Sequence, residues 1–344
     1  MIHSYLTNRC QRVRVNANYS SWSEIIYGVP QGSILGPVLF NIYLSDLFLF
    51  ITNTDIANYA DDNSPYACKD DIESVITKLE NDSRTLIEWV SNNALKANPD
   101  KFHLLLNSHD KNISINVENC QIFNSQNEKL LGIVIDNDLK FDEHVTRLCN
   151  KGSQKLHALA RVSPYMNTNQ RKRIIKAFIS SQFGYCPLVW MFHSRTLNNR
   201  INRLHERALR IVSNDNLSSF EQLLHKDSSV TIHERNIQAL AIEIYKIING
   251  LAPDIMNIVL PLKDSNKYCS RFPFKTQNIR TVRYGSETIH FLGPKIWSAI
   301  PQSYKNVTTL EEFKNKIKQW KPICPCRLCK TYVASVGFVD SNDK

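Results

Sequence analysis

The sequence lacks a long apolar run. Its richest apolar stretch is interrupted by Asn41, Ser45 and Asp46, whereas a bilayer-spanning helix needs about 20 mostly apolar residues. The amino terminus has no apolar core of the kind that signal peptides carry. We therefore expect an intracellular protein of the nucleus or the cytoplasm, with no membrane partner.

The sequence also lacks the cysteine pattern of a disulfide scaffold. Its nine cysteines are odd in number and mostly scattered, which favours reduced thiols. Cys324, Cys326 and Cys329 form one cluster that could supply most of a four-ligand Zn²⁺ site. His290 or Cys269 would be a distant fourth ligand. The alternative is three free thiols near the tail.

Acidic residues are scarce in the second half of the chain. Residues 1–150 hold 12 Lys and Arg against 19 Asp and Glu, a net charge of −7, whereas residues 151–344 hold 30 against 13, a net charge of +17. This asymmetry indicates that the second half meets a polyanion. The alternative is a solvated basic surface without a dedicated ligand. The 344 residues permit about two domains.

The most informative segment that is present is Tyr59-Ala60-Asp61-Asp62. An alternating apolar stretch precedes it and Pro65 follows it, which predicts a β-hairpin with both carboxylates at the tip. Two carboxylates on a rigid turn suit a hard divalent cation such as Mg²⁺, the usual catalyst of phosphoryl transfer. By itself, such a pair is as typical of a solvated surface turn.

Three other segments accompany this hairpin along the chain. Gly28 to Pro37 supplies turn residues ahead of an apolar segment. Within it, Gly32 allows close approach of a ligand to the backbone, and Gln31 brings an amide that can donate and accept. Asn98 to Lys101 forms a turn, and Leu130 to Asp136 is expected to be a buried strand.

In this order, the segments resemble the palm of reverse transcriptases encoded by non-LTR (LINE-type) retrotransposons of the jockey and CR1-like branch. The segment at Gly28 is similar to their motif B, and Tyr59 to Asp62 is similar to motif C. Asn98 to Lys101 is similar to motif D, and Leu130 to Asp136 to motif E. The resemblance extends through Tyr185 to Trp190 and onward to the cysteine cluster, so it covers nearly the whole chain.

The resemblance implies an α+β fold with three parts. Residues 1–143 would form a partial right-hand polymerase palm, with a small antiparallel sheet and helices. Residues 144–212 would form a helical thumb, and residues 213–344 a basic, mostly helical carboxy-terminal region. The family places another catalytic carboxylate in motif A, upstream of motif B. Only residues 1–27 precede motif B here, so we expect a carboxy-terminal fragment that begins after motif A and is inactive by itself.

The resemblance also implies the reaction and the residues that serve it. The reaction is RNA-directed DNA synthesis by two-metal nucleotidyl transfer, with an RNA template, a DNA primer and deoxynucleoside triphosphates as partners and Mg²⁺ or Mn²⁺ as cofactor. Asp61 would be the principal metal ligand and Asp62 the supporting carboxylate. Lys101 would assist the leaving pyrophosphate. The other implied residues are Gln31 and Gly32 in the nucleotide pocket, and Leu131 and Gly132 in the primer grip.

Helical periodicity predicts most of the remaining elements. Asp70 to Ser91 is expected to be an amphipathic helix, started by Asp70 or Asp71 and packed on the sheet that carries Asp61. Residues 144–212 are expected to form three helices, with Asp142 as the cap of the first and Pro187 as the break after the second. Thr309 and Glu312 predict a capping box for the last helix.

The third of these helices carries an apolar stripe and, about 100° away, a basic stripe. The basic stripe consists of Arg200, Arg203, Arg207 and Arg210. Guanidinium groups in such a row can contact successive phosphates, and the resemblance to a thumb that grips template and primer favours this interpretation. The alternative is a surface helix whose basic residues face solvent. As a whole, the chain could instead be a non-catalytic nucleic-acid-binding remnant, or a decayed reading frame with no role.

Overall fold

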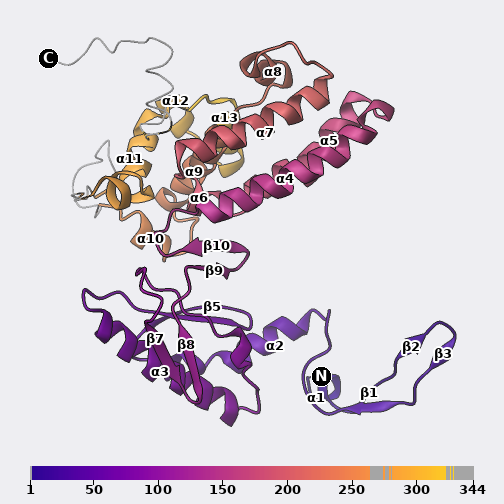
Figure 1. Ribbon diagram of the computed structural model, residues 1–344, viewed down its shortest axis with the longest axis vertical. Coiled ribbons are helices and arrows are strands. Elements are labelled where there is room, and N and C mark those ends of the chain that lie inside the picture. The colour runs from indigo at the N-terminus through magenta and orange to yellow at the C-terminus, as the bar shows by residue number, and fades with distance from the viewer. Residues whose placement is uncertain are drawn as a thin grey trace. The chain divides into compact units, whose positions relative to one another are not determined.

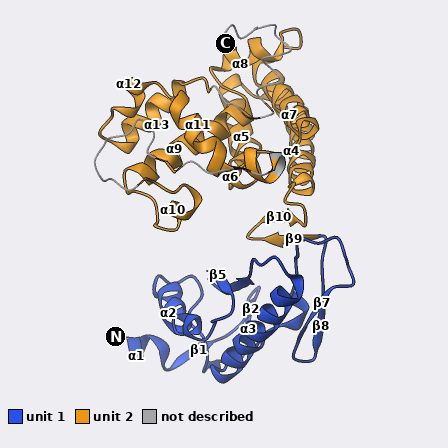
Figure 2. Ribbon diagram, turned by 90° about the vertical axis from the view of Figure 1, so that its left-hand side faces the viewer, with its two compact units in different colours: residues 1–126 blue, residues 127–344 orange. Residues whose placement is uncertain are grey.

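The computed structural model describes residues 2–263, 274, 275, 279, 281–322, 326 and 328 (Figure 1). The chain divides into two compact units, residues 1–126 (unit 1) and residues 127–344 (unit 2) (Figure 2). Both units mix helices with short antiparallel strands, so the expected α+β class is confirmed. None of the helices in the described ranges has the length and apolarity that a bilayer span requires.

Antiparallel strand pairs make up the sheets of unit 1. Its described residues form separate two-stranded sheets rather than one small sheet. Three of the pairs are hairpins of consecutive strands, and the fourth pair encloses one of these hairpins. The pairs are β1 (Arg9–Gln11) with β4 (Ser23–Ile25), β2 (Arg14–Val15) with β3 (Asn18–Tyr19), β5 (Asp55–Tyr59) with β6 (Asp62–Tyr66), and β7 (Ser114–Val117) with β8 (Cys120–Phe123).

The long helix α3 (Ile72–Asn92) organises the core of unit 1. The carboxylate of Asp71 accepts hydrogen bonds from the N–H groups of Glu73 and Ser74, so the predicted helix start is confirmed at Asp71. Leu79 and other apolar residues of α3 pack with Ile115 of β7 in one buried cluster, and α3 also contacts β6, as expected. The other helices of unit 1 are α1 (Ile2–Leu6), α2 (Leu35–Leu44), η1 (Leu47–Leu49) and η2 (Pro99–Lys101).

Helices dominate unit 2, which begins with one hairpin. The hairpin is β9 (Asn127–Leu130) with β10 (Ile133–Asp136). The helices that follow are α4 (Asp142–Val162), η3 (Ser163–Tyr165), α5 (Thr168–Phe178), η4 (Ser180–Gly184), α6 (Pro187–Trp190), α7 (Arg195–Ser213), α8 (Phe220–Asp227), α9 (Ile232–Ile248), α10 (Met256–Val259), η5 (Val282–Ser286), α11 (Ile289–Ala299), α12 (Gln302–Lys305) and α13 (Leu310–Gln319).

Two hydrophobic clusters stabilise unit 2. The first joins β10, α4, α5 and α7, with Leu156 and Ile201 almost completely buried. Gly152 permits the close approach of α4 to α7, because a Cβ at this position would lie 2.9 Å from a methyl carbon of Leu204. The second cluster surrounds α9, where Tyr245 stacks on Phe313 of α13 with 4.2 Å between the ring centroids. The apolar stripe of α7 is therefore a packing surface, as its periodicity predicted.

Two local predictions for unit 2 are wrong. Leu130 to Asp136 is not one strand, because Leu131 and Gly132 adopt φ values of 47° and 88° and form a two-residue turn between β9 and β10. Asp142 does not cap α4. Phe141 occupies the cap position with a left-handed φ of 57°, and the carboxylate of Asp136 accepts the N–H groups of Lys140 and Phe141 instead.

The other helix predictions for unit 2 hold, with one addition, α6, and one exception: only the Thr309 half of the predicted capping box is present, because the carboxylate of Glu312 pairs with Lys316. Residues 144–212 contain the three expected helices α4, α5 and α7, and Pro187 begins the short additional helix α6. Thr309 caps α13, since its hydroxyl oxygen accepts the N–H of Glu312.

Candidate functional site

The acidic pair lies at the tip of the β5–β6 hairpin, as predicted. The two strands pair from Asp55 opposite Tyr66 to Tyr59 opposite Asp62. The loop is therefore only two residues long, Ala60 and Asp61, and Ala60 has a left-handed φ of 54°. The side chain of Asn58 stiffens this turn, because its Nδ2 donates to the Ala60 carbonyl at 3.1 Å and to Asn63 Oδ1 at 2.7 Å.

Both carboxylates at this tip are exposed and available. Neither Asp61 nor Asp62 accepts a hydrogen bond or forms an ion pair with its side chain within the described part of the chain. Other aspartates differ: the carboxylate of Asp136 accepts three backbone N–H groups, and that of Asp215 binds Lys226 and Ser218. The oxygens of the acidic pair are thus suited to a hard cation such as Mg²⁺.

A buried carboxylate anchors the base of the same hairpin. Asp82 of α3 is only 1% exposed, and its oxygens accept from the backbone and side chains of both Asn53 and Thr54 at 2.6–2.9 Å. Burial opposes the charge of this group, but the hydrogen bonds outweigh it and lower the pKa of Asp82. The segment that enters β5 is therefore attached to α3.

The glycine-rich loop before α2 is held by one serine. Ser33 Oγ donates to the Pro30 carbonyl at 2.7 Å and accepts the N–H of Gly36 at 3.1 Å, and the Tyr5 hydroxyl donates to it as well. Gly32 has a φ of 78°, and a Cβ there would meet nothing within 4 Å. Its backbone conformation, rather than crowding, accounts for glycine at this position. Gln31 beside it is exposed.

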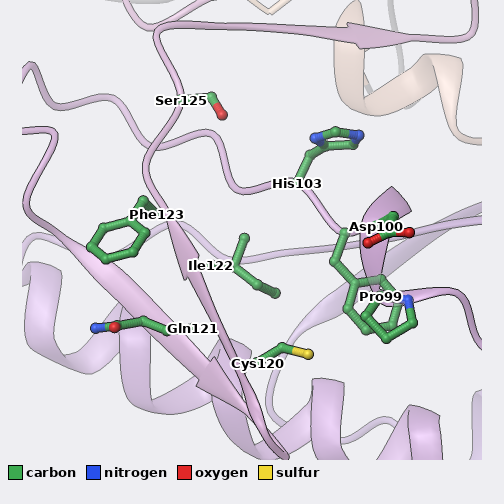
Figure 3. Close-up of a pocket in the computed structure, with 9 residues that line it drawn as sticks. Pro99, Asp100, His103, Cys120, Gln121, Ile122, Phe123 and Ser125 are labelled. Atoms are coloured by element: carbon green, nitrogen blue, oxygen red, sulfur yellow. The ribbon is translucent and has the colours of Figure 1, made fainter.

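The motif D segment is a short 3₁₀ turn beside a pocket in unit 1. Asn98 Oδ1 accepts the N–H of Asp100 at 3.1 Å and so caps η2. Figure 3 shows Asp100 and His103 at the pocket, together with residues of the β7–β8 hairpin. The volume of this pocket is roughly 380 Å³. Lys101 is exposed on the same turn.

The turn of the β9–β10 hairpin makes a contact that the sequence did not reveal. Tyr185, from the segment before α6, donates its hydroxyl to the carbonyl of Leu131 at 2.6 Å. A Cβ at Gly132 would lie 3.5 Å from the same aromatic ring. His144 also holds the hairpin, since its Nδ1 accepts the N–H of Val134 on β10 at 3.3 Å. Tyr185 follows Leu131 by 54 residues in the chain, so no local sequence pattern links the two residues.

The four arginines of α7 have different surroundings. Arg200 donates from Nη2 to Asn150 Oδ1 at 2.6 Å, and the guanidinium of Arg207 lies 3.2 and 3.3 Å from the ring nitrogens of His157, both on α4. Arg210 forms an ion pair with Glu206. Arg203 is exposed and has no hydrogen bond or ion pair among the described residues. The stripe thus contains one unengaged guanidinium and three that also bind neighbouring side chains.

The predicted zinc ligands lie partly outside the described residues. Cys324, Cys329 and Cys269 are in undescribed segments. Cys326 is buried, with its Sγ 3.3 Å from Nε2 of His233, and His290 lines a separate pocket of unit 2. Within the described ranges, no group of three or more His, Cys, Asp or Glu side chains is arranged to hold a metal ion.

The structure distributes the predicted site residues over both units. Unit 1 carries those assigned to chemistry and nucleotide binding, namely Gln31, Gly32, Asp61, Asp62 and Lys101. Unit 2 carries those assigned to primer and duplex contacts, namely Leu131, Gly132, Arg200, Arg203, Arg207 and Arg210. Each group is on short turns or a helix face, where side chains are accessible to a ligand.

Comparison with known proteins gives a consistent result. Residues 1–135 match the family model described as reverse transcriptase (RNA-dependent DNA polymerase). The matched range contains the glycine-rich loop, the β5–β6 hairpin, the motif D turn and β9–β10 up to Ile135. No solved structure matches the chain.

Three curated relatives come from Drosophila melanogaster. The chain is 27% identical over 251 residues to the probable RNA-directed DNA polymerase from transposon BS, covering 69% of this chain and 28% of the relative. It is 26% identical over 225 residues to the RNA-directed DNA polymerase from mobile element jockey, covering 62% and 25%. It is 24% identical over 243 residues to the probable polymerase from transposon X-element, covering 66% and 26%. The aligned part spans about a quarter of each relative.

Proposed function

We propose, from the premise that the chain is related to the reverse transcriptases of non-LTR retrotransposons, that it contributes to RNA-directed DNA synthesis. The observation that carries the proposal is the pair of exposed, unengaged carboxylates at the β5–β6 tip. Asp61 would be the principal ligand of Mg²⁺ or Mn²⁺ and Asp62 the supporting one. Bound metal would acidify the primer 3′-hydroxyl and stabilise the charge of the leaving pyrophosphate.

The other residues that the resemblance assigns would bind and orient the substrates. Gln31 and Gly32 would contact the incoming deoxynucleoside triphosphate through an amide and an exposed backbone. Lys101 would stabilise charge on the leaving pyrophosphate, or give it a proton. Leu131 and Gly132 would contact the primer, with Tyr185 holding their turn in position. Proximity of these groups to the reacting atoms is the main contribution that a protein makes to phosphoryl transfer.

Metal binding at the tip can be tested without activity. Fe²⁺ in place of Mg²⁺, with ascorbate and peroxide, produces hydroxyl radicals that cut the backbone near the bound ion. We expect cleavage close to residues 59–63, abolished in Asp61→Asn. Asp70→Asn is the matched control, since it also removes an exposed carboxylate from an adjacent Asp pair in unit 1. Equal cleavage in the wild-type chain and in Asp61→Asn would refute the metal assignment.

Polymerase chemistry can be tested in a chimera. The segment of the transposon BS polymerase that precedes its matched region is joined to residues 1–344, and extension of a DNA primer on an RNA template is measured with Mg²⁺. We expect incorporation that falls by at least about 10³-fold in Asp61→Asn, because loss of a metal ligand removes several kcal/mol of charge stabilisation. Incorporation that survives Asp61→Asn would exclude the proposed role.

A second candidate function is binding of nucleic acid without catalysis, and α7 supports it. Arg203 presents an exposed guanidinium, and the helix lies in the strongly basic part of the chain. Arg200, Arg207 and Arg210 would add charge from the same stripe. Two results together would favour this function over the first. The chain would bind a template–primer duplex tightly, and the chimera would incorporate no nucleotide.

A further inference from the structure

Two antiparallel strand pairs near the amino terminus form an exposed ribbon. β1 pairs with β4, and β2 pairs with β3 around a turn at Asn16, which has a φ of 54°. In Figure 1 the β2–β3 end of this ribbon lies away from α2 and α3. Every residue from Gln11 to Glu24 is exposed. We call residues 9–25 the ribbon.

Two arginines of the ribbon lie against aromatic rings. The guanidinium carbon of Arg12 is 4.0 Å from the ring centroid of Tyr19 and 4.6 Å from that of Trp22. That of Arg14 is 5.5 Å from the centroid of Tyr19, its partner across the strands. These distances are within the range of cation–π attraction. The four side chains therefore form one surface, made of two cations and two rings.

This surface is not occupied by the rest of unit 1. The side chain of Tyr19 is 50% exposed and that of Trp22 is 63% exposed. Arg12 makes no hydrogen bond or ion pair with any described residue, and Arg14 donates only to the Asn16 carbonyl in the same part of the chain. Arg12 and Arg14 thus keep N–H groups for an external acceptor while their guanidinium groups lie near the rings.

The charge of the ribbon is opposite to that of the unit that bears it. Residues 9–25 hold three arginines and one acidic residue, Glu24, whereas residues 1–126 as a whole hold 9 Lys and Arg against 14 Asp and Glu. A local excess of positive charge on an acidic unit cannot be explained as a general surface property. It points to a negatively charged ligand at this position.

We propose that the surface formed by Arg12, Arg14, Tyr19 and Trp22 binds single-stranded nucleic acid without regard to base sequence. Tyr19 and Trp22 stack on one or two bases, and the arginines donate to the adjacent phosphates. Stacking on an aromatic side chain contributes about 1–3 kcal/mol per base and tolerates every base. The site is separate from Asp61, Asp62 and the α7 stripe, and its occupation does not depend on the polymerase proposal.

A single strand fits this surface better than a duplex does. The rings can stack only on bases that have a free face, and inside a duplex both faces of each base are covered by the neighbouring base pairs. Val13 and Val15 are also exposed, at 65% and 64%. They do not take part in the cation–π contacts, so the proposed surface does not require them.

Tryptophan fluorescence gives a local test on the whole chain. The protein has five tryptophans, and Trp22 is the only exposed one, since Trp89, Trp190, Trp297 and Trp320 are 0–7% exposed. Titration with a ten-residue oligothymidylate should quench the long-wavelength emission of Trp22. Trp22→Phe should lose that emission component together with the quenching.

Substitutions separate stacking from charge. Arg12→Gln with Arg14→Gln should weaken the affinity reported by Trp22 at least tenfold and make the salt slope shallower by about 1.4, since each single-strand phosphate contributes about 0.7. Tyr19→Leu keeps the charge and should weaken the affinity at least fivefold. Arg161→Gln with Arg173→Gln, two exposed arginines of unit 2, should leave the affinity at Trp22 unchanged.

Three outcomes would overturn the proposal. The first is absence of Trp22 quenching by the oligonucleotide while circular dichroism shows a folded chain. The second is quenching of equal strength by heparin, which would show that charge alone acts. The third is unchanged affinity in Tyr19→Leu, which would exclude stacking and leave the aromatic rings as a surface for a protein partner.

Discussion

Single histidines of unit 2 show how burial controls protonation. His193 donates from Nδ1 to the carbonyl of Trp190 at 3.0 Å, and His205 packs edge-on against Phe220. Burial lowers the pKa of His193 to about 4, and burial together with the nearby Arg235 lowers the pKa of His205 to about 4. Both side chains are therefore neutral in the folded protein near pH 7.

The two depressed pKa values predict acid sensitivity of unit 2. Between pH 4 and the ordinary histidine value of 6.5, the unfolded chain binds more protons than the folded chain. The free energy of unfolding is then highest above pH 6.5 and falls as the pH decreases towards 4. At pH 5 we expect the free energy of unfolding to be lower than at pH 7 by about 2 kcal/mol per histidine, because one pKa unit corresponds to about 1.36 kcal/mol. Urea unfolding at pH 7 and at pH 5 measures this difference.

Replacement of one histidine identifies the source of this pH dependence. His205→Gln should reduce the loss of unfolding free energy between pH 7 and pH 5 by about 2 kcal/mol, the share expected from one histidine. His225→Gln, at an exposed position of α8, should leave it unchanged. A pH dependence that stays the same in His205→Gln would show that other groups cause it.

At the scale of elements, the β9–β10 turn depends on a contact from a distant segment. Tyr185→Phe removes the hydroxyl that donates to Leu131 and leaves the ring in place. We expect a loss of about 0.5–1 kcal/mol in the free energy of unfolding, near the lower end for a hydrogen bond because Tyr185 is half exposed. Tyr165→Phe is the control, since Tyr165 is 90% exposed. Equal effects of the two substitutions would contradict the role of the contact.

Helix α7 is the element that we expect to control duplex binding. Replacing Arg200, Arg203, Arg207 and Arg210 by Gln keeps a good helix former at each position. Affinity for a template–primer duplex should fall for all sequences alike, and the salt slope should become shallower by about 2 to 4. Filter binding over a salt series measures both quantities.

The four arginines need not contribute equally. Arg203 alone is exposed without a described partner, so we expect Arg203→Gln to have the largest single effect. A control variant replaces four basic residues of α11 and α13 by Gln, namely Lys295, Lys314, Lys316 and Lys318. If this control weakens binding as much as the α7 variant does, net charge rather than the stripe is responsible.

At the scale of the whole molecule, each hydrophobic cluster belongs to one unit. The clusters around α3 are built from unit 1, and those around α4 and α9 from unit 2. Charge follows the same division, because residues 127–344 hold 33 Lys and Arg against 18 Asp and Glu. Folding and polyanion binding are therefore expected to be properties of the separate units.

This division predicts that residues 127–344 fold alone. The isolated segment should unfold cooperatively in urea and bind a template–primer duplex within about threefold of the affinity of the full chain, because its cores and the α7 stripe are intact. Circular dichroism and filter binding check the two parts. A segment that is unfolded at neutral pH would show that its clusters are insufficient.

Local patterns in the sequence predicted much of the fold and part of the site. Alternation and turn residues predicted the β5–β6 hairpin with Asp61 and Asp62 at its tip, and 3.6-residue periodicity predicted α3 and α7. These features depend on neighbours within a few residues, so the sequence shows them directly. The prediction of one strand over Leu130 to Asp136 failed because apolar residues outweighed the turn signal of Gly132.

What only the tertiary structure decided concerns contacts between distant segments. The sequence by itself determined the acidic pair, the basic stripe and the division of charge, because composition and local conformation follow from residue type. It did not show that Arg207 lies against His157, that Tyr185 holds the turn at Leu131, or that His193 is buried and neutral. Those facts depend on which surfaces meet when helices pack, and packing brings together residues whose separation in the chain carries no signal.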